Sequence, residues 1–366
     1  MNKKKNIVRE SKFELMRIIA ILFIITWHII MHGHLIENTT NQSIIIPLQI
    51  IQFLIMVHVS LFILLTGYFQ SKSKFKFKKF IKLIIITIFY SITLYLISIK
   101  VGWITDYNKI SLFNNMNLSS VGGYWFISQY LILYALSNYI NIFINSLNKK
   151  QYNKLLIILF IILSIIPLLT GNKIIANSGY NFYFFIYLYL IGAYLRIYPL
   201  KKSYLFKKTT NKKYILIMIS IFLLMTYLNF SIQYLTDHFK SLNSIFSELY
   251  NRISYTKLSY SSPFCIIQAI SLFEIFNSMN IKSNIINYIS KYVIGIYLIH
   301  DNNYIRQNIY KIIGIDKPYN SYKVFITIII TTISIFIACL IIDIIRDKLF
   351  NLITTLYKKK HKKSKI

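Results

Sequence analysis

Four ionisable side chains interrupt the first long apolar segment of the chain, and their types suit proton transfer and anion binding. They are Glu14, Arg17, His28 and His32. If residues 13–32 form a helix, a turn of about 100° per residue places all four on one face. At about 1.5 Å of rise per residue, His28 then lies roughly 16 Å along the axis from Arg17. One stripe would therefore carry a cation at one end and imidazoles near the other.

The types in this stripe point to two kinds of chemistry. An imidazole suits general-base work because its unperturbed pKa lies near the working pH, which makes His28 a candidate base. The planar fork of Arg17 suits a phosphate-bearing ligand, since it can hold two phosphate oxygens at once. A structural interpretation also stays open. Glu14 and Arg17 could form an ion pair at a membrane interface, with His28 as a hydrogen-bonded packing residue.

The composition indicates that the helix with this stripe belongs to a membrane protein. Of the 366 residues, 55% are hydrophobic, and the mean hydropathy is +0.53, which is too apolar for a soluble domain of this size. About 20 helical residues cross a hydrocarbon core, and the long runs here are apolar on every side, unlike the alternating strands of a barrel. We predict an all-α, polytopic integral membrane protein with about ten transmembrane helices. They lie near 13–32, 45–69, 80–100, 124–144, 153–171, 181–197, 213–230, 260–280, 288–306 and 322–349.

The charge distribution predicts the topology. The chain has 42 Lys and Arg against 11 Asp and Glu, a formal charge of +31. In a soluble protein this would suggest nucleic acid, but here the basic residues gather in alternate connections, at 70–79, 145–154 and 196–213, and at both ends. Loops rich in Lys and Arg stay in the cytoplasm. We therefore expect a multi-pass protein of the cell membrane, surrounded by lipid, with both termini cytoplasmic and no nucleic-acid partner.

The remaining organisation is simple. We expect a basic cytoplasmic N-terminal segment over 1–12, a transmembrane domain over 13–350 and a basic cytoplasmic tail over 351–366. The longest non-cytoplasmic loop, roughly 231–259, is polar and could fold over an outer opening. No metal-ligand spacing is present in the sequence, and the two cysteines lie in apolar stretches without CxxC spacing, so we interpret them as buried packing residues.

Five segments carry a resemblance to a known family. The first holds an arginine, ten residues and then a histidine, which are Arg17 and His28, with Glu14 three positions before the arginine. The segments are RESKFELMRIIAILFIITWHIIMHG at 9–33, SLFILLTGYF at 60–69, GGYWFISQYLILYALSNYI at 122–140, NFYFFIYLYLIGAYLRIYP at 181–199 and SKYVIGIYLIHDN at 290–302. In this order, over about residues 9–350, the chain resembles the acyltransferase-3 family of membrane enzymes that O-acylate surface sugars.

The resemblance implies a reaction and roles for these residues. The family uses a cytoplasmic acyl donor, usually acetyl-coenzyme A, and transfers the acyl group to a sugar hydroxyl on the outer side or within the membrane. Arg17 would hold a donor phosphate, His28 would take the hydroxyl proton or relay the acyl group, and Glu14 would orient Arg17 or shape the entrance. Acyl-coenzyme A is then a substrate, and no bound cofactor or metal is expected.

Three further residues are candidates for the acceptor site. The resemblance places His300 at the histidine of the family's YLIH helix, and its expected position towards the outer end of that helix would let it approach His28. Trp125 would begin a helix at the outer interface, where tryptophan is also common for lipid anchoring alone. His32 completes the stripe one turn beyond His28. A structural role for His300 remains equally open.

Two functions from different classes fit this sequence. The first is an O-acetyltransferase acting on a cell-surface polysaccharide or its lipid-linked precursor. The second is a transporter that exports a glycan or a lipid-linked sugar without modifying it. Helices interrupted by Gly or Pro favour transport, and with ten Gly and five Pro in the chain the helices are expected to be continuous, which favours the enzyme.

Overall fold

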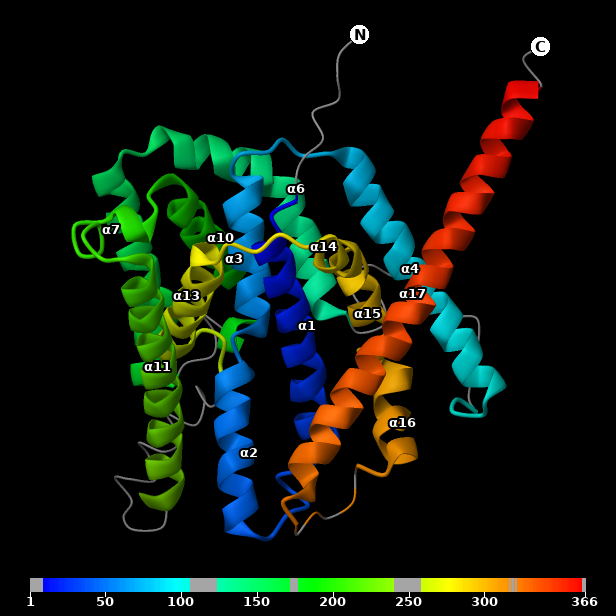
Figure 1. The fold of residues 1–366 in the computed structure, drawn as a ribbon, viewed down its shortest axis with the longest axis horizontal. Coiled ribbons are helices and arrows are strands. Elements are labelled where there is room, and N and C mark those ends of the chain that lie inside the picture. The colour runs from blue at the N-terminus through cyan, green and yellow to red at the C-terminus, as the bar shows by residue number, and fades with distance from the viewer. Residues whose placement is uncertain are drawn as a thin grey trace.

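The computed structural model describes residues 9–105, 124–171, 177–239, 258–315, 317, 319 and 321–363. Over these ranges the secondary structure is helical, without a strand (Figure 1). The α-helices are α1 (Ser11–His32), α2 (Gln42–Ile55), α3 (His58–Gln70), α4 (Phe77–Lys100), α6 (Trp125–Ser146), α7 (Lys149–Phe160), α8 (Ile166–Thr170), α10 (Phe182–Ile197), α11 (Asn211–Phe239), α13 (Pro263–Ser278), α14 (Asn284–Ile289), α15 (Val293–His300), α16 (Asn303–Ile313) and α17 (Lys323–Lys363). Short 3-10 or π turns are η2 (Ile161–Ile165), η3 (Asn177–Gly179), η4 (Leu200–Lys202) and η5 (Ser290–Tyr292).

Seven helical stretches in the described residues are long and apolar enough to cross a membrane. They comprise α1, α2 with α3, α4, α6, α7 through α8, α11 and α17. The prediction of an all-helical, multi-pass membrane protein is thus confirmed, whereas the count of ten remains a prediction. Helices α10 and α13 are also apolar, but each has 16 residues. The start of α1 and the end of α17 lie at the same end of the molecule (Figure 1).

Helix α1 occupies the centre of the helical assembly, packed between α2, α3 and α13 on one side and α15, α16 and α17 on the other (Figure 1). Its span is 56% buried, against 28% for α17 and 17% for the stretch through α7. Phe13 and Met16 pack into one hydrophobic cluster, and Ile21 and Ile25 pack into another. Within the ionisable stripe on this helix, Glu14 and His28 are therefore largely enclosed by protein, whereas His32 is exposed.

Helices α3 and α10 approach each other closely through two glycines. A Cβ added at Gly67 would lie 2.1 Å from the Tyr189 carbonyl oxygen, and one at Gly192 would lie 2.1 Å from that of Leu64. Small residues allow such backbone contact, which gains dispersion energy where lipid offers no hydrophobic driving force. Gly67 and Gly192 thus serve close contact between the two helices.

The expected helix over 45–69 is interrupted, and the prediction of a continuous helix was wrong there. Helix α2 ends at Ile55 and α3 begins at His58. The freed carbonyls are satisfied by side chains: His58 Nδ1 lies 2.8 Å from the Ile55 oxygen, and Gln268 Nε2 donates to the Phe53 oxygen at 3.0 Å. Broken backbone at membrane depth is tolerated only when its polar groups find such partners.

The expected helix over 288–306 is also wrong in form. It is replaced by α14, η5, α15 and α16, with a non-helical turn at Asp301 and Asn302. Here again an imidazole contacts a carbonyl near the break, since His300 Nδ1 lies 2.7 Å from the Ile296 oxygen. The Asn302 side chain caps the next helix by accepting from the Tyr304 amide at 3.1 Å. The expected outer loop at 231–259 falls largely outside the described residues, and α11 extends to Phe239.

Candidate active site

The basic end of the α1 stripe forms an ion pair. Arg17 Nη1 lies 2.8 Å from Glu14 Oε1, and Glu14 is buried at 7% exposure. The Arg17 side chain is 30% exposed, and its guanidinium lies over the Phe69 ring at 5.8 Å. The contact fixes one edge of the guanidinium, whose remaining N–H donors are available to another anion. The ion pair foreseen as the structural interpretation exists, and it also orients Arg17.

Further cations surround this pair. Arg9 Nη1 lies 3.9 Å from Glu14 Oε2. The Lys79 ammonium, in the first turn of α4, lies within electrostatic range of Arg9, Arg17 and Lys76. Such a concentration of positive charge attracts anionic ligands. The basic segment 70–79, which served mainly as a topology signal in the sequence, therefore also brings Lys79 into electrostatic range of Arg17.

Three histidines meet at the other end of the stripe. The His28 and His300 rings lie 5.3 Å apart between centroids, and the His28 and His32 rings lie 5.2 Å apart. His300 is 1% exposed, the His28 side chain is 13% exposed, and His32 is exposed. The cluster thus leads from the surface, past His32, to two enclosed imidazoles. The structure brings together the three histidines that the sequence singled out, while their roles remain predictions.

The hydrogen bond of His300 determines its tautomer. A carbonyl oxygen can only accept, so the 2.7 Å contact with the Ile296 oxygen places a proton on Nδ1 and leaves a lone pair on Nε2 in the neutral ring. Among the described residues Nε2 has no hydrogen-bond partner, although it is buried. A buried polar atom without a partner costs about 1–3 kcal/mol, so an atom of this kind is well suited to receive a substrate hydroxyl.

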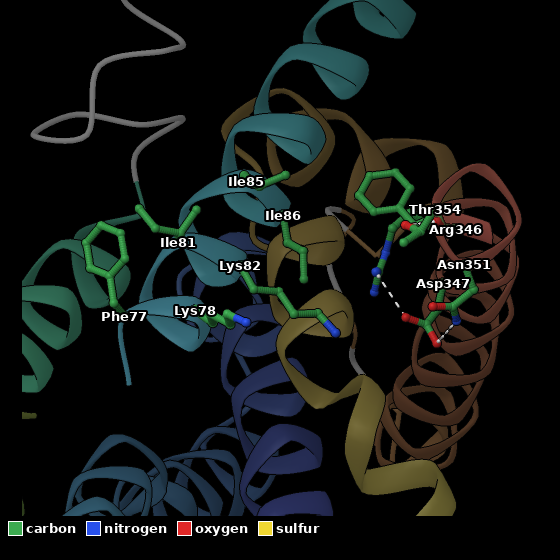
Figure 2. A pocket seen from close by; sticks show the side chains of 11 residues that line it. Phe77, Lys78, Ile81, Lys82, Ile85, Ile86, Arg346, Asp347, Asn351 and Thr354 are labelled. Carbon is green, nitrogen blue, oxygen red and sulfur yellow. Dashed lines mark hydrogen bonds and ion pairs between the residues drawn. The ribbon is translucent and has the colours of Figure 1, made fainter. Parts of the chain in front are cut away.

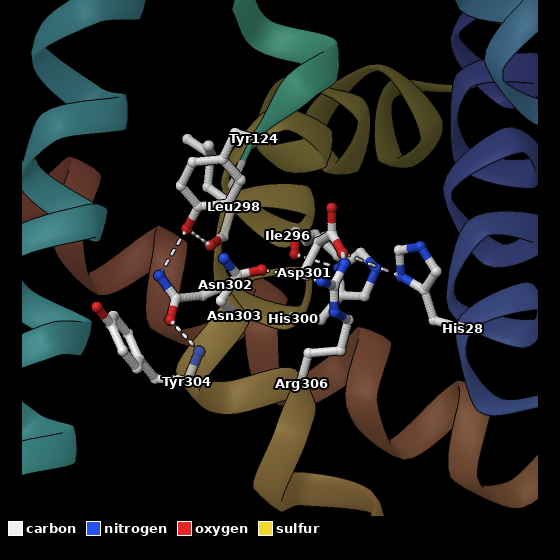
Figure 3. A network of polar contacts seen from close by, with 10 residues as sticks. All are labelled: His28, Tyr124, Ile296, Leu298, His300, Asp301, Asn302, Asn303, Tyr304 and Arg306. Carbon is white, nitrogen blue, oxygen red and sulfur yellow. Dashed lines mark hydrogen bonds and ion pairs between the residues drawn. The ribbon is translucent and has the colours of Figure 1, made fainter. Parts of the chain in front are cut away.

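Asp301 lies between an arginine and His28 (Figure 3). Arg306 Nη1 donates to Asp301 Oδ1 at 2.7 Å, and the same oxygen lies 3.5 Å from His28 Nδ1. Arg306 also donates to Asn303 Oδ1 at 2.8 Å, so the guanidinium is held at two points. The 3.5 Å separation exceeds an ordinary hydrogen bond, yet the carboxylate favours the tautomer with the proton on Nδ1. His28 Nε2 is then the atom that can accept a proton.

The turn that carries Asp301 is braced from its far side (Figure 3). The Tyr124 hydroxyl donates to the Leu298 carbonyl oxygen, and Asn302 Nδ2 donates to the Tyr124 oxygen at 3.0 Å. Both Tyr124 and Asn302 are buried. A satisfied buried network of this kind rigidifies its surroundings, and here it ties the turn that carries Asp301 to the start of α6.

Trp125 belongs to a neighbouring aromatic group. Its ring lies 4.6 Å from Tyr180 and 6.3 Å from Tyr260 between centroids. The Tyr260 hydroxyl in turn lies 3.1 Å from His58 Nε2. The structure therefore connects Trp125 to the break between α2 and α3, where His58 bonds to backbone and side chain as a packing residue does.

The arrangement brings together a partly exposed guanidinium at Arg17, an imidazole beside a carboxylate at His28, and an imidazole nitrogen without a partner in the described residues at His300. In the described part of the chain, no group of three or more His, Cys, Asp or Glu side chains is arranged to hold a metal ion. Cys265 and Cys339 are free and buried, as expected. Arg306 was not among the residues that the sequence singled out. The sequence signal for it is an oppositely charged pair, Asp301 and Arg306, five residues apart at the end of an apolar segment.

The chain belongs to the acyltransferase-3 family. The family model, described as an acyltransferase domain, matches residues 10–345, which cover nearly the whole chain. Neither a curated protein nor a solved structure matches the chain. The matched region includes the α1 stripe, the histidine cluster and the Asp301 turn, and it defines the class of protein as a membrane acyltransferase.

Proposed function

We propose that the chain is a membrane O-acetyltransferase. It transfers an acetyl group from cytoplasmic acetyl-coenzyme A to a hydroxyl of a cell-surface polysaccharide or its lipid-linked precursor. The observation that carries the proposal is the placement of His28. His28 lies near one end of α1, beside His300 and Asp301, which come from α15 and the turn after it. Arg17 lies near the other end of α1.

The donor binds through its phosphates at the basic end of α1. Arg17 supplies the fork, Glu14 holds the guanidinium, and Lys79 adds charge. The long, flexible arm that joins the phosphates of coenzyme A to its thioester then extends along the stripe towards His28, roughly 16 Å away. Binding energy gained at the phosphates positions the reacting thioester, which converts affinity into rate.

The acyl transfer balances with His28 as base. The acceptor hydroxyl gives its proton to His28 Nε2 while its oxygen attacks the thioester carbonyl, the C–S bond breaks, and the departing thiolate takes the proton back. Asp301 stabilises the imidazolium that forms during this exchange, since its carboxylate oxygen is 3.5 Å from Nδ1. His300 Nε2 and His32 contact the acceptor. In a two-step variant, His28 carries the acetyl group before the hydroxyl attacks.

The topology follows the charge pattern. The lysine-rich segments support a cytoplasmic position for the start of α1 and the end of α17, with the acceptor on the outer side of the membrane. Arg17 then faces the compartment that contains acetyl-coenzyme A, and the histidine cluster lies towards the acceptor side.

Ester-linked acetate on the surface glycan tests the proposal in cells. The comparison uses wild type, a deletion, His28→Ala and the control His34→Asn, with membrane levels verified. His34 is an exposed histidine at the same end of α1 with a φ of 51°, which asparagine tolerates. Loss of ester in the deletion and in His28→Ala, with glycan still at the surface and the control unaffected, is the expected result. Full ester content in the deletion would contradict the proposal.

The interrupted helices favour a second candidate, which is export of a glycan or lipid-linked sugar without modification. Transporters form substrate sites at discontinuous helices, and both interruptions here lie beside histidines, at His58 and at His300. The argument from helix continuity against transport therefore no longer holds. Export predicts that the deletion removes glycan from the surface while the ester content per glycan is unchanged.

A further inference from the structure

A groove separates α4 from α17 at the end of the molecule that carries the lysine-rich segments. The two helices cross near their middles and separate towards that end (Figure 1). The groove has a volume of about 520 Å³ (Figure 2). Its lining residues belong to these two helices alone: Phe77, Lys78, Ile81, Lys82, Ile85, Ile86, Arg346, Asp347, Phe350, Asn351 and Thr354.

The apolar part of this groove suits a hydrocarbon chain. Phe77 is 65% exposed and Ile85 is 51% exposed. Phe350 adds an aromatic ring to the lining and packs edge-on against Phe89, with centroids 5.0 Å apart. Both helices are candidate membrane spans. Exposed side chains of this size on such helices lie in contact with lipid acyl chains.

The polar part of the groove is cationic. Lys78 and Lys82 are exposed and lie one turn apart on α4, while Arg346 faces them from α17 (Figure 2). Against these three cations the lining holds one carboxylate, Asp347, whose Oδ1 lies 3.4 Å from Arg346 Nη1. Even with the buried Asp343 that pairs with Arg346 counted, three cations face two carboxylates. The excess charge comes from the exposed Lys78 and Lys82, so the walls favour an anion.

The Arg346 wall is fixed in place. Its Nε and Nη2 donate to Asp343 Oδ1 at 2.9 and 2.6 Å, and the Tyr90 hydroxyl donates to the same oxygen at 2.6 Å. Arg346 is 7% exposed and Asp343 is 1% exposed. This buried network joins α4 to α17 where they cross, so the guanidinium is held at the base of the groove before any ligand arrives.

We propose that this groove binds an anionic phospholipid. The phosphate lies between Lys78, Lys82 and Arg346, and an acyl chain follows Ile81 and Ile85 along α4. A basic pocket between membrane helices near a lysine-rich face recognises the head groups of anionic lipids, which concentrate in the cytoplasmic leaflet. None of the lining residues belongs to the α1 stripe or the histidine cluster. The lipid site and the proposed function therefore stand or fail separately.

Native mass spectrometry of the purified full chain tests the site with three probes: phosphatidylglycerol, phosphatidylcholine and glycerol phosphate. The variant is Lys78→Gln with Lys82→Gln. The control is Lys150→Gln with Lys154→Gln, which removes two exposed lysines at the same spacing at the start of α7. With each lysine near a membrane surface contributing about fivefold, the variant should bind phosphatidylglycerol roughly 30-fold more weakly than wild type, and the control should bind like wild type.

Three results would overturn the lipid site. Equal binding of phosphatidylcholine and phosphatidylglycerol would remove the role of the lipid's charge. Equal weakening in the Lys150 and Lys154 control would reduce the effect to general surface charge. Binding of glycerol phosphate as tight as that of the lipid would leave the apolar walls without a role. Acetyl transfer measured on the same samples reports on the proposed function independently.

Discussion

Replacing Asp301 by asparagine removes the charge beside His28 while keeping the shape of the side chain. The carboxylate oxygen lies 3.5 Å from His28 Nδ1 and 2.7 Å from Arg306 Nη1. Two effects follow from the substitution. The imidazolium formed during proton transfer loses its stabilising neighbour, and Arg306 loses its partner. The rate effect and the stability effect must therefore be measured separately.

The size of the rate effect can be bounded. Unit charges 3.5 Å apart interact by about 5 kcal/mol at an effective dielectric constant of 20, which is an upper limit because Arg306 offsets part of the carboxylate's field. A positioned general base contributes about 10²- to 10⁴-fold to a rate. Since 3.5 Å is longer than a hydrogen bond, we expect a loss in kcat near the lower figure, about 100-fold. The KM for acetyl-coenzyme A should stay close to that of wild type.

The stability effect follows from the Arg306 contact. Removing one member of a buried pair costs about 3–5 kcal/mol, but the Arg306 side chain is 24% exposed, so water compensates part of this and the cost should be smaller. The double variant Asp301→Asn with Arg306→Gln removes the unpaired cation. It should recover most of the thermal stability and none of the rate.

The assay measures labelled acetyl transfer in proteoliposomes, together with thermal unfolding of the same samples. Wild-type turnover in Asp301→Asn, at wild-type protein level, would refute the role given to Asp301. Recovery of the rate in the double variant would also refute it, because the loss would then have come from the orphaned Arg306.

Two further predictions concern the other end of α1 and the packing of α15. Arg17→Gln should raise the KM for acetyl-coenzyme A by about 10- to 150-fold, which is the value of a charge-assisted hydrogen bond. Arg17→Lys should recover only part of the lost affinity because lysine lacks the planar fork. An unchanged KM in Arg17→Gln would contradict this prediction. Gly295→Ala would place a Cβ 2.0 Å from Asp343 Cγ, so overpacking should destabilise the protein by about 1–3 kcal/mol, whereas Ile294→Ala, at an exposed neighbour, should change the thermal midpoint little.

The sequence could predict what depends on local patterning. The spacing of Glu14, Arg17, His28 and His32 placed them on one face of α1, and the structure shows this helix packed among other helices, with Glu14 buried and His32 exposed. The expected approach of His300 to His28 is confirmed by the ring separation of 5.3 Å. Helical periodicity is reliable here because a membrane span must satisfy its own backbone hydrogen bonds.

The sequence could not predict contacts that depend on tertiary packing. The breaks after Ile55 and His300 need no Gly or Pro, because side chains supply the missing hydrogen bonds: His58 and Gln268 at the first break, and Tyr124, which donates to the Leu298 carbonyl, at the second. The 3.5 Å contact between His28 and Asp301 joins residues 273 positions apart. Hydrogen-bonding side chains near the ends of apolar segments are the sequence signal that could have indicated both the helix breaks and the contact between His28 and Asp301.

Acetyl transfer by the purified protein in proteoliposomes, with labelled acetyl-coenzyme A and the native glycan, tests most directly whether His28 is the base of an acetyltransferase. We expect wild type to form a labelled ester that hydroxylamine releases. We expect His28→Ala to be at least about 100-fold slower, which is the contribution of a general base, with the fold and coenzyme A binding retained. Ester formation by His28→Ala at the wild-type rate would show that His28 is not the base. The absence of any ester from wild type, while a known acetyltransferase produces it under the same conditions, would contradict the proposed acetyl transfer itself.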